Sequence, residues 1–421
     1  MKHIFFKNGL SRVCRFARDK KVIFSFVSSV LLIFLTYFAN NAPLFTGESM
    51  TQYAVIQKIC EKFGIHKTVS YGDALFYNVS YDKMLITATR DENRRDTIGV
   101  RAVTDREKLL RFLRLLEKSD KYKYVVLDIV FDENDVSVYD DSLFHQISRM
   151  RDIVVANHSL INFADSNLIE TGKTGLVTYF TTSVTTNFGR FEFKQKDHNS
   201  LPLEVYEHLH PDNHMKRYGF GRLSFYKLGG KLCQNASFLT FDDSFSVPVN
   251  EILNEKQRAL SSNYINLGSF IDDSTYSEAL LLRLVKTNTD DKFVVIGDFV
   301  EDIHDTYMGA IPGSVIVMRA LATLEEGGNL VYVLQIIIWL LIFLLINLSI
   351  CYNKPLSKRI PLIRNIKYKW FHFLFSIVSF SAILTIISTI EYICGYPVSS
   401  LVIPVLYFSL LKLFVQFNAY I

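Results

Sequence analysis

The sequence predicts an α/β domain, a mixed sheet with flanking helices, attached to a membrane by one helix before it and three after it. Two patterns support this fold class. Long apolar runs lie near the two ends of the 421-residue chain, which is 49% hydrophobic and contains 34 phenylalanines. Between these runs, amphipathic helical segments alternate with short apolar runs rich in β-branched residues, as in a sheet covered by helices.

Four apolar segments have the length of a transmembrane helix. They are residues 22–38, 330–352, 370–390 and 398–417, and each is close to the roughly 20 residues that a bilayer core requires. The first segment could instead belong to a cleaved signal peptide. However, Asn40 occupies the −3 position of the only candidate cleavage site, and the run is long for a signal peptide, so an uncleaved anchor is favoured.

Basic residues predict the orientation of these segments. Seven Lys and Arg residues and one acid lie within residues 1–21, and six basic residues and no acid lie within residues 353–369. Glu391 is the only charge between the third and fourth segments. The positive-inside rule then places both termini and the 353–369 loop in the cytoplasm, with residues 39–329 outside. Because the basic residues cluster beside apolar runs and the net charge is only +4, nucleic acid is not an expected partner.

The outer region contains alternating helix and strand patterns. The segment 105–118 is the clearest helix: leucines recur at helical spacing, Lys and Arg fall on the other face, and Thr104 or Asp105 can cap it. Further helices are predicted at 53–63, 140–150, 201–209, 275–285 and 314–324, and strands at 74–79, 84–87, 124–131, 153–156, 175–180, 188–193, 264–267 and 293–296. The order helix, strand, helix, strand over residues 100–156 favours parallel pairing.

Polar residues follow two of the predicted strands. Asp128 lies within the strand 124–131, and a loop rich in acids and turn formers follows the strand 293–296. In open α/β sheets the ligand crevice lies beyond the carboxyl ends of the strands, so the two loops are expected to face one crevice. The candidate ligand-binding or cation-binding residues are Asp128, Asp132, Asp302, His304, Asp305 and Thr306.

A structural interpretation of the same residues is also open. Asp and Thr can cap the helices that follow, while Gly297, Gly309, Pro312 and Gly313 can serve tight turns.

Other chemistry is weakly indicated. His208, His210 and His214 could bind a metal, but a solvated helix end is the favoured interpretation, and no metal or cofactor is expected. The sequence contains no G-x-S-x-G, HExxH, P-loop or GxGxxG motif, so we do not expect an enzyme. Cys60 and Cys233 fall in the outer region and could form a disulfide, although their spacing does not require one.

Four stretches of the outer region resemble a known family. They are Tyr124–Glu133 (YVVLDIVFDE) after its amphipathic helix, the helix and strand of 140–156, Tyr264–Gly268 before a helix, and Phe293–Gly313 with VVIGDF and HDTYMGAIPG. Together with one span before and three after, they resemble the CHASE2 family, the extracytoplasmic sensor domain of bacterial transmembrane receptors. The resemblance covers about residues 45–417. Two departures are that Arg101–Thr104 replaces the family's Trp-Pro-Arg element, and that the sequence ends at Ile421 without the usual C-terminal output domain.

The resemblance implies a multi-pass protein of the bacterial inner membrane with a periplasmic sensor domain over residues 39–329. Such a protein would bind an unknown signal and relay it through the helix at 314–324 and the connection Glu325–Asn329 into the second span. Its partners would be the lipid bilayer, a separate membrane or cytoplasmic signalling protein and, as a candidate, a second copy of itself. The alternative is a structural or assembly subunit of a cell-envelope complex that sends no signal.

Overall fold

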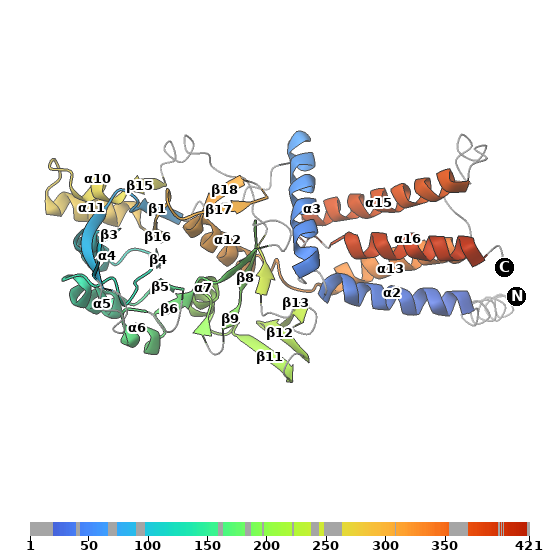
Figure 1. Ribbon diagram of the computed structural model, residues 1–421, viewed down its shortest axis with the longest axis horizontal. Coiled ribbons are helices and arrows are strands. Elements are labelled where there is room, and N and C mark those ends of the chain that lie inside the picture. The colour runs from blue at the N-terminus through green and yellow to red at the C-terminus, as the bar shows by residue number, and fades with distance from the viewer. Residues whose placement is uncertain are drawn as a thin grey trace, which may run out of the picture. The chain divides into compact units, whose positions relative to one another are not determined.

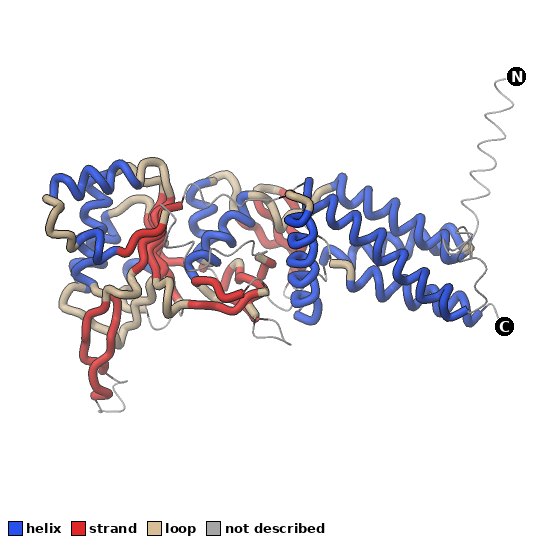
Figure 2. Tube along the Cα trace, turned by 90° about the horizontal axis from the view of Figure 1, so that it is seen from above, coloured by secondary structure: helices blue, strands red, loops and turns tan. Residues whose placement is uncertain are grey.

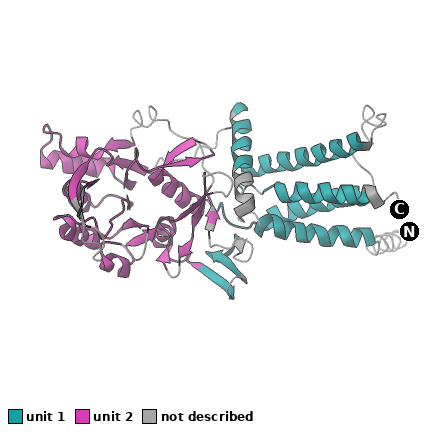
Figure 3. Cartoon of the chain, viewed as in Figure 1, with its two compact units in different colours: residues 1–67, 216–241, 328–421 teal, residues 68–215, 242–327 magenta. Residues whose placement is uncertain are grey.

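The chain divides into two compact units, shown in Figure 3. The membrane unit comprises residues 1–67, 216–241 and 328–421, and the α/β unit comprises residues 68–215 and 242–327. The computed structural model describes residues 20–38, 43–65, 74–89, 97–158, 163–181, 187–195, 198–220, 223–236, 244–247, 263–307, 309–352, 369–394, 396, 398 and 400–418. Residues 1–19 and 353–368, which carry most of the basic side chains used to predict orientation, lie outside the described residues.

The α/β unit is built on a six-stranded parallel sheet (Figure 1). Its strands lie in the order β15 (Tyr264–Asn266), β1 (Ala74–Asn78), β16 (Phe293–Gly297), β4 (Tyr124–Asp128), β5 (Ile153–Asn157) and β6 (Thr174–Leu176). Every adjacent pair in this sheet is parallel, whereas a mixed sheet was predicted. The four inner strands are almost entirely buried on both faces, as parallel strands covered by helices must be.

Helices cover both faces of this sheet. One face carries α4 (Arg106–Ser119), α5 (Asp140–Arg149), α10 (Leu267–Ile271) and α11 (Glu278–Asn288); α7 (Leu201–Leu209) and α12 (Gly313–Glu325) pack on the other face. The short α6 (Ser166–Glu170) precedes β6. Asp105 caps α4 by accepting hydrogen bonds from the amides of Glu107 and Lys108, so the predicted cap is confirmed.

The main core lies between the sheet and the α4 layer. Alternate strand residues such as Tyr77, Leu127 and Ile296 pack there against Phe112 and Leu116 of α4. All five of these residues are at most 1% exposed. The apolar face predicted for the 105–118 helix is therefore confirmed as the face that closes the core.

Smaller antiparallel sheets surround this core. They are β2 (Lys83–Thr89) with β3 (Thr97–Thr104), β7 (Tyr179–Thr181) with β8 (Phe188–Glu192) and β14 (Ser244–Ser246), β9 (Lys194–Gln195) with β10 (His198–Asn199), and β17 (Ile303–Thr306) with β18 (Gly309–Pro312). The β2–β3 hairpin extends from the α/β unit as a long ribbon in Figure 2. The single strand predicted at 175–180 is wrong: its residues belong to β6 and β7, which lie in different sheets.

The membrane unit is a helical bundle with a small sheet. Its helices are α2 (Lys20–Phe38), α3 (Pro43–Lys62), α13 (Val333–Cys351), α15 (Lys369–Cys394) and α16 (Val402–Asn418); its sheet contains β11 (Met215–Phe220), β12 (Leu223–Leu228) and β13 (Lys231–Ala236). Among the described residues, three helices are long and apolar enough to cross a membrane: Lys20–Phe38, Val333–Cys351 and Trp370–Cys394. The fourth predicted span coincides with α16, whose apolar part, Val402–Val415, is shorter. This composition fits a membrane protein.

Polar side chains join the helices of the bundle. Asn347 of α13 donates hydrogen bonds to the Ser29 hydroxyl at 2.8 Å and the Ser28 hydroxyl at 3.2 Å, both on α2. Glu391 of α15 accepts a hydrogen bond from Gln335 of α13 at 2.6 Å, and another from the indole of Trp339 on the same oxygen. Buried polar groups of this kind fix which helices are neighbours.

Two further predicted features fall in the membrane unit. The helix expected at 53–63 begins ten residues earlier, because it continues from Pro43 to Lys62 as α3. Cys60 and Cys233 are both buried, and no disulfide joins them.

Candidate functional site

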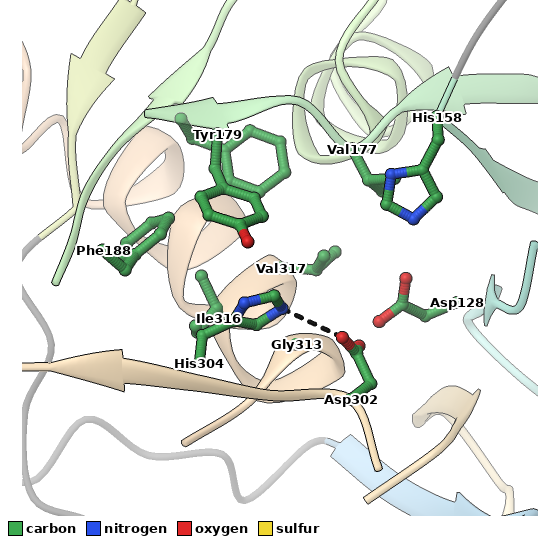
Figure 4. A pocket seen from close by; sticks show the side chains of 11 residues that line it. Asp128, His158, Val177, Tyr179, Phe188, Asp302, His304, Gly313, Ile316 and Val317 are labelled. Carbon is green, nitrogen blue, oxygen red and sulfur yellow. Dashed lines mark ion pairs between the residues drawn. The ribbon is translucent and has the colours of Figure 1, made fainter. Parts of the chain in front are cut away.

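A small cavity opens at the carboxyl ends of β4 and β16 in the α/β unit. Its volume is about 30 Å³, room for roughly one water molecule. Its walls come from β4, from the segment after β5, from β7 and β8, and from the β17 hairpin and α12 (Figure 4). The residues that line it are Asp128, His158, Val177, Tyr179, Phe188, Phe191, Asp302, His304, Gly313, Ile316 and Val317.

The cavity lies where polar residues end neighbouring strands. Asn266, Asn78, Gly297, Asp128 and Asn157 are the last residues of β15, β1, β16, β4 and β5, in the order of the sheet. Asn78 is paired in register with Gly297, and Gly297 with Asp128. The sequence therefore changes from apolar to polar at one level across the sheet. This is the edge at which parallel α/β sheets bind ligands.

Asp128 is held by the first turn of α12. The Ser314 hydroxyl donates a hydrogen bond to Oδ2 of Asp128 at 2.8 Å. The glycine at 297 makes room for this contact, since a Cβ atom there would lie 2.0 Å from the Ser314 Oγ. Gly297 has no positive φ angle, so its role is close approach rather than the tight turn predicted from the sequence.

Asp302 and His304 form an ion pair on a neighbouring wall. Oδ1 of Asp302 lies 2.9 Å from Nε2 of His304, as drawn in Figure 4. The Gly313 amide donates to the Asp302 carbonyl at 2.9 Å, and a Cβ at Gly313 would lie 2.1 Å from the Asp302 carboxylate. Asp302 and Asp128 thus contact Gly313 and Ser314, respectively, which are the first two residues of α12.

Burial changes the proton affinity of this cluster. Burial, and then the neighbouring Asp302 charge, raise the pKa of Asp128 to about 7, while the Ser314 hydroxyl and His304 oppose the shift in part. Asp128 keeps some surface, which faces the cavity, although protein surrounds its carboxyl group. Burial also lowers the pKa of His158, and the nearby Asp302 partly offsets this. The cavity therefore contains a carboxyl group that can gain or lose a proton near neutral pH.

Two titratable residues of the cavity were not predicted as site residues. His158 directly follows β5, the strand beside β4, so the rule that selected Asp128 could also have selected it. The ring of Tyr179 lies 4.7 Å from that of His304 in an edge-to-face contact. Burial, followed by the Asp302 charge, raises the pKa of Tyr179. Tyr179 belongs to a separate small sheet, and no local pattern places that sheet here.

The remaining predicted residues lie away from the cavity. Asp132 accepts hydrogen bonds at 2.8 Å from the amide and the side chain of Asn134, so it closes a turn. Asp305 is exposed on β17, where alternation directs it opposite to His304. The Thr306 hydroxyl donates to the Gly309 carbonyl at 2.7 Å inside the hairpin turn, where Gly309 has a φ of 110°.

The segment after Gly297 is a loop over Asp298–Asp302, as predicted, but β17 and β18 then form a hairpin that was not predicted. Pro312 ends β18 and forms the N-cap position of α12, and Gly313 is the first residue of that helix. Gly309 has the positive φ of a turn residue, but Gly313 does not.

The three clustered histidines of the sequence do not converge. His208 contacts Asp152 at 2.9 Å, His210 lies 3.9 Å from Glu325, and His214 lies 3.2 Å from Glu207. Within the described part of the chain, no group of three or more His, Cys, Asp and Glu side chains could hold a metal ion. The cavity residues therefore do not form a cation site of the type considered from the sequence.

A second polar cluster lies beside the cavity at the end of β16. Asp298 accepts hydrogen bonds from Lys83 at 2.8 Å and from the Ser80 hydroxyl at 2.6 Å, as well as from the amides of Val300 and Glu301. Burial alone would raise the pKa of Asp298, but these donors lower it to about 2. With so many hydrogen bonds to protein, Asp298 is suited to fixing the loop in place.

Comparison with family models, curated proteins and solved structures finds no match to this chain.

Proposed function

We propose that this protein is a membrane-anchored sensor similar to the CHASE2 family, which reads an extracytoplasmic signal at the Asp128 cavity. In this proposal the α/β unit is periplasmic, four helices cross the bacterial inner membrane and both termini are cytoplasmic. The distribution of basic residues supports that orientation, and the three long apolar helices support membrane insertion. The signal passes to a separate membrane or cytoplasmic protein, with the basic segment 353–369 as the candidate contact.

One observation carries the proposal: the cavity and α12 share their polar contacts. Ser314 bonds Asp128, Gly313 contacts Asp302, and Ile316 and Val317 complete the wall, all within the first turns of one helix. α12 ends at Glu325 and the membrane helix α13 begins at Val333, so a short connection follows the helix in the chain. A change of charge or occupancy at Asp128 therefore acts at the start of the helix that leads to the membrane.

The size of the cavity favours a very small signal. A space of about 30 Å³ is close to the size of one water molecule, so a proton or a single water fits it best. Four other titratable groups line the cavity with Asp128: Asp302, His304, His158 and Tyr179. We therefore propose that the site reports protonation, and that a neutral Asp128 and a charged Asp128 correspond to two states of α12.

The experiment is a crosslinking pull-down of the full-length protein from native membranes. Asp128→Asn, which fixes this position as neutral, is compared with Asp305→Asn, which removes an exposed acid of the same segment that lies outside the cavity. A cytoplasmic or membrane signalling protein whose recovery changes only in Asp128→Asn supports the sensor. If the unsubstituted protein and both variants recover the same envelope proteins at the same level, the sensor proposal is rejected and an assembly subunit is favoured.

A flexible Gly/Ser insertion between Glu325 and Asn329 tests the relay separately. It should abolish the effect of Asp128→Asn on partner recovery. If that effect persists with the insertion, the signal does not travel through this connection.

A further inference from the structure

Helix α3 lies across the ends of the membrane helices. Both views of the chain show it running crosswise to α15 and α16 rather than along them (Figures 1 and 2). Ile56 and Cys60 are buried with Tyr392 of α15, and the Tyr53 and Tyr392 rings are 5.4 Å apart. The Gln52 side chain accepts a hydrogen bond at 3.0 Å from the amide of Leu401, next to α16. One face of α3 is thereby fixed to the bundle.

Another face of α3 is apolar and exposed. Val55 and Ile59 of α3, and Phe63 directly after its last residue, recur at a spacing of four residues and are 48%, 37% and 78% exposed. Lys58 and Lys62 are exposed beside this stripe. A solvent-exposed stripe with a phenylalanine this open is unfavourable in water and marks a contact surface. The stripe and the two lysines together have the pattern of a helix that lies in a membrane interface.

The surroundings of α3 indicate what covers this stripe. At the same end of the bundle, Ile390 and Ile393 of α15 and Val333 and Leu334 of α13 are each at least half exposed, as lipid-facing residues of a spanning helix are. The rings of Tyr332 and Tyr396 also meet there, 5.3 Å apart, and tyrosine is enriched at the membrane–water boundary. The exposed stripe of α3 thus lies at the end of the bundle where the spanning helices also expose apolar side chains.

We propose that α3 is an in-plane interfacial helix. Its Val55–Ile59–Phe63 stripe inserts at the boundary between acyl chains and headgroups, and Lys58 and Lys62 bind the phosphates of anionic lipids. The crosswise direction follows from this role, because a helix that lies in the interface must run parallel to the membrane plane. The backbone ends α3 beside this stripe: Gly64 has a φ of 72°, and the Ile65 amide donates to the Cys60 carbonyl at 2.9 Å. This proposal rests on membrane insertion alone and is independent of the sensor function.

The test uses full-length protein in lipid nanodiscs and a tryptophan at position 63. Phe63→Trp is compared with Val138→Trp, which places the same fluorophore at a 90% exposed position in the α/β unit. Emission of the two native tryptophans is subtracted using the unsubstituted protein. With lipids brominated near the top of the acyl chain, the emission added by Phe63→Trp should fall by about half or more, while that added by Val138→Trp stays unchanged. Ile59→Trp, one turn earlier, should behave like Phe63→Trp and serves as the second variant if the first fails to fold.

Two outcomes would overturn the proposal. Unquenched, red-shifted emission from Phe63→Trp would show that the stripe faces water. Unquenched, blue-shifted emission would show that protein, such as a second copy of the chain, covers it.

The lysines are tested in the Phe63→Trp protein. Quenching should be stronger in nanodiscs that contain phosphatidylglycerol than in phosphatidylcholine alone, and Lys58→Gln/Lys62→Gln should remove that difference. Lys118→Gln, an exposed charge in the α/β unit, should leave the difference intact. If the double substitution changes nothing, lipid phosphates do not bind these lysines.

Discussion

Ser314 of α12 donates a hydrogen bond to the carboxylate of Asp128 on β4 across 2.8 Å, directly beyond the last residue of β16. This contact joins the centre of the parallel sheet to the helix that precedes the membrane segment. It exists because Gly297 carries no side chain.

Gly297→Ala should destabilise the α/β unit by roughly 1–3 kcal/mol, because its new methyl group would meet the Ser314 hydroxyl at 2.0 Å. Urea unfolding of the full-length protein in detergent, followed by proteolysis of the α/β unit, measures this loss. Gly297→Ala/Ser314→Ala should recover part of it, since the clashing oxygen is gone. A double variant no more stable than Gly297→Ala would assign the loss to another contact.

Stability of the α/β unit should fall as pH rises from about 4 to about 7. The pKa of Asp128 is raised from 3.8 to about 7 in the folded protein, so across this window the folded state holds a proton that the unfolded state has lost. The penalty is complete above about pH 7 and is worth at most roughly 4 kcal/mol. Asp128→Asn should be more stable than the unsubstituted protein at pH 8 and equal to it near pH 4. If the free energies of unfolding of the two proteins change with pH in parallel, the raised pKa of Asp128 is contradicted.

Asp298 should have the opposite pH dependence. Its pKa is lowered to about 2 in the folded state, so its contribution is present above about pH 4 and is lost as pH falls toward 2. Asp298→Asn should cost about 2 kcal/mol at pH 7 by the same urea assay. Glu301→Gln is the matched control: Glu301 pairs with the same lysine at 3.0 Å but is 71% exposed, so its loss should cost at most about 0.5 kcal/mol. Equal losses in both variants would mean that burial does not distinguish the two carboxylates.

Glu391→Ala should weaken the contact between α13 and α15. It removes the oxygen that accepts hydrogen bonds from Gln335 and Trp339, and a buried donor without an acceptor costs about 1–3 kcal/mol. Thermal unfolding of the purified protein, followed by size-exclusion fluorescence, should show a midpoint lower by several degrees. Ser379→Ala, whose hydroxyl bonds only the preceding turn of α15, should leave the midpoint close to that of the unsubstituted protein. A similar decrease in both would indicate a general effect of alanine in α15.

Elements with a strong local pattern were predictable from the sequence. The strands at Tyr124 and Phe293 are continuous apolar runs because both of their faces are buried, and the α4 helix shows its core face as leucines at helical spacing. The strand β3 was missed because Thr97–Thr104 alternates weakly and pairs only with β2. The sequence of the β17–β18 hairpin predicts a loop because Asp305, Gly309 and Pro312 have turn propensity, yet pairing across the turn overrides it.

Only the part of the site that lies at the ends of the parallel strands could be predicted from the sequence. Asp128, Asp302 and His304 come together because parallel strands end at one edge of the sheet, which the order of elements already indicated. Asp305 was included although a hairpin directs alternate residues to opposite sides, and the hairpin itself was not foreseen. Tyr179 and Phe188 reach the cavity from a separate sheet, a long-range arrangement that no local pattern encodes.

The strand order also constrains how the protein is made. β16, almost the last strand in the chain, inserts between β1, the first, and β4. Until the ribosome has synthesised it, β1 and β4 each have an open edge in what will become the centre of the sheet, a state that invites mispairing. The sheet can therefore close only shortly before the membrane helix α13 is synthesised. Completion of the α/β unit and insertion of its next membrane segment are thus neighbouring events in biosynthesis, and a chain stalled before residue 293 would be a substrate for chaperones or proteases.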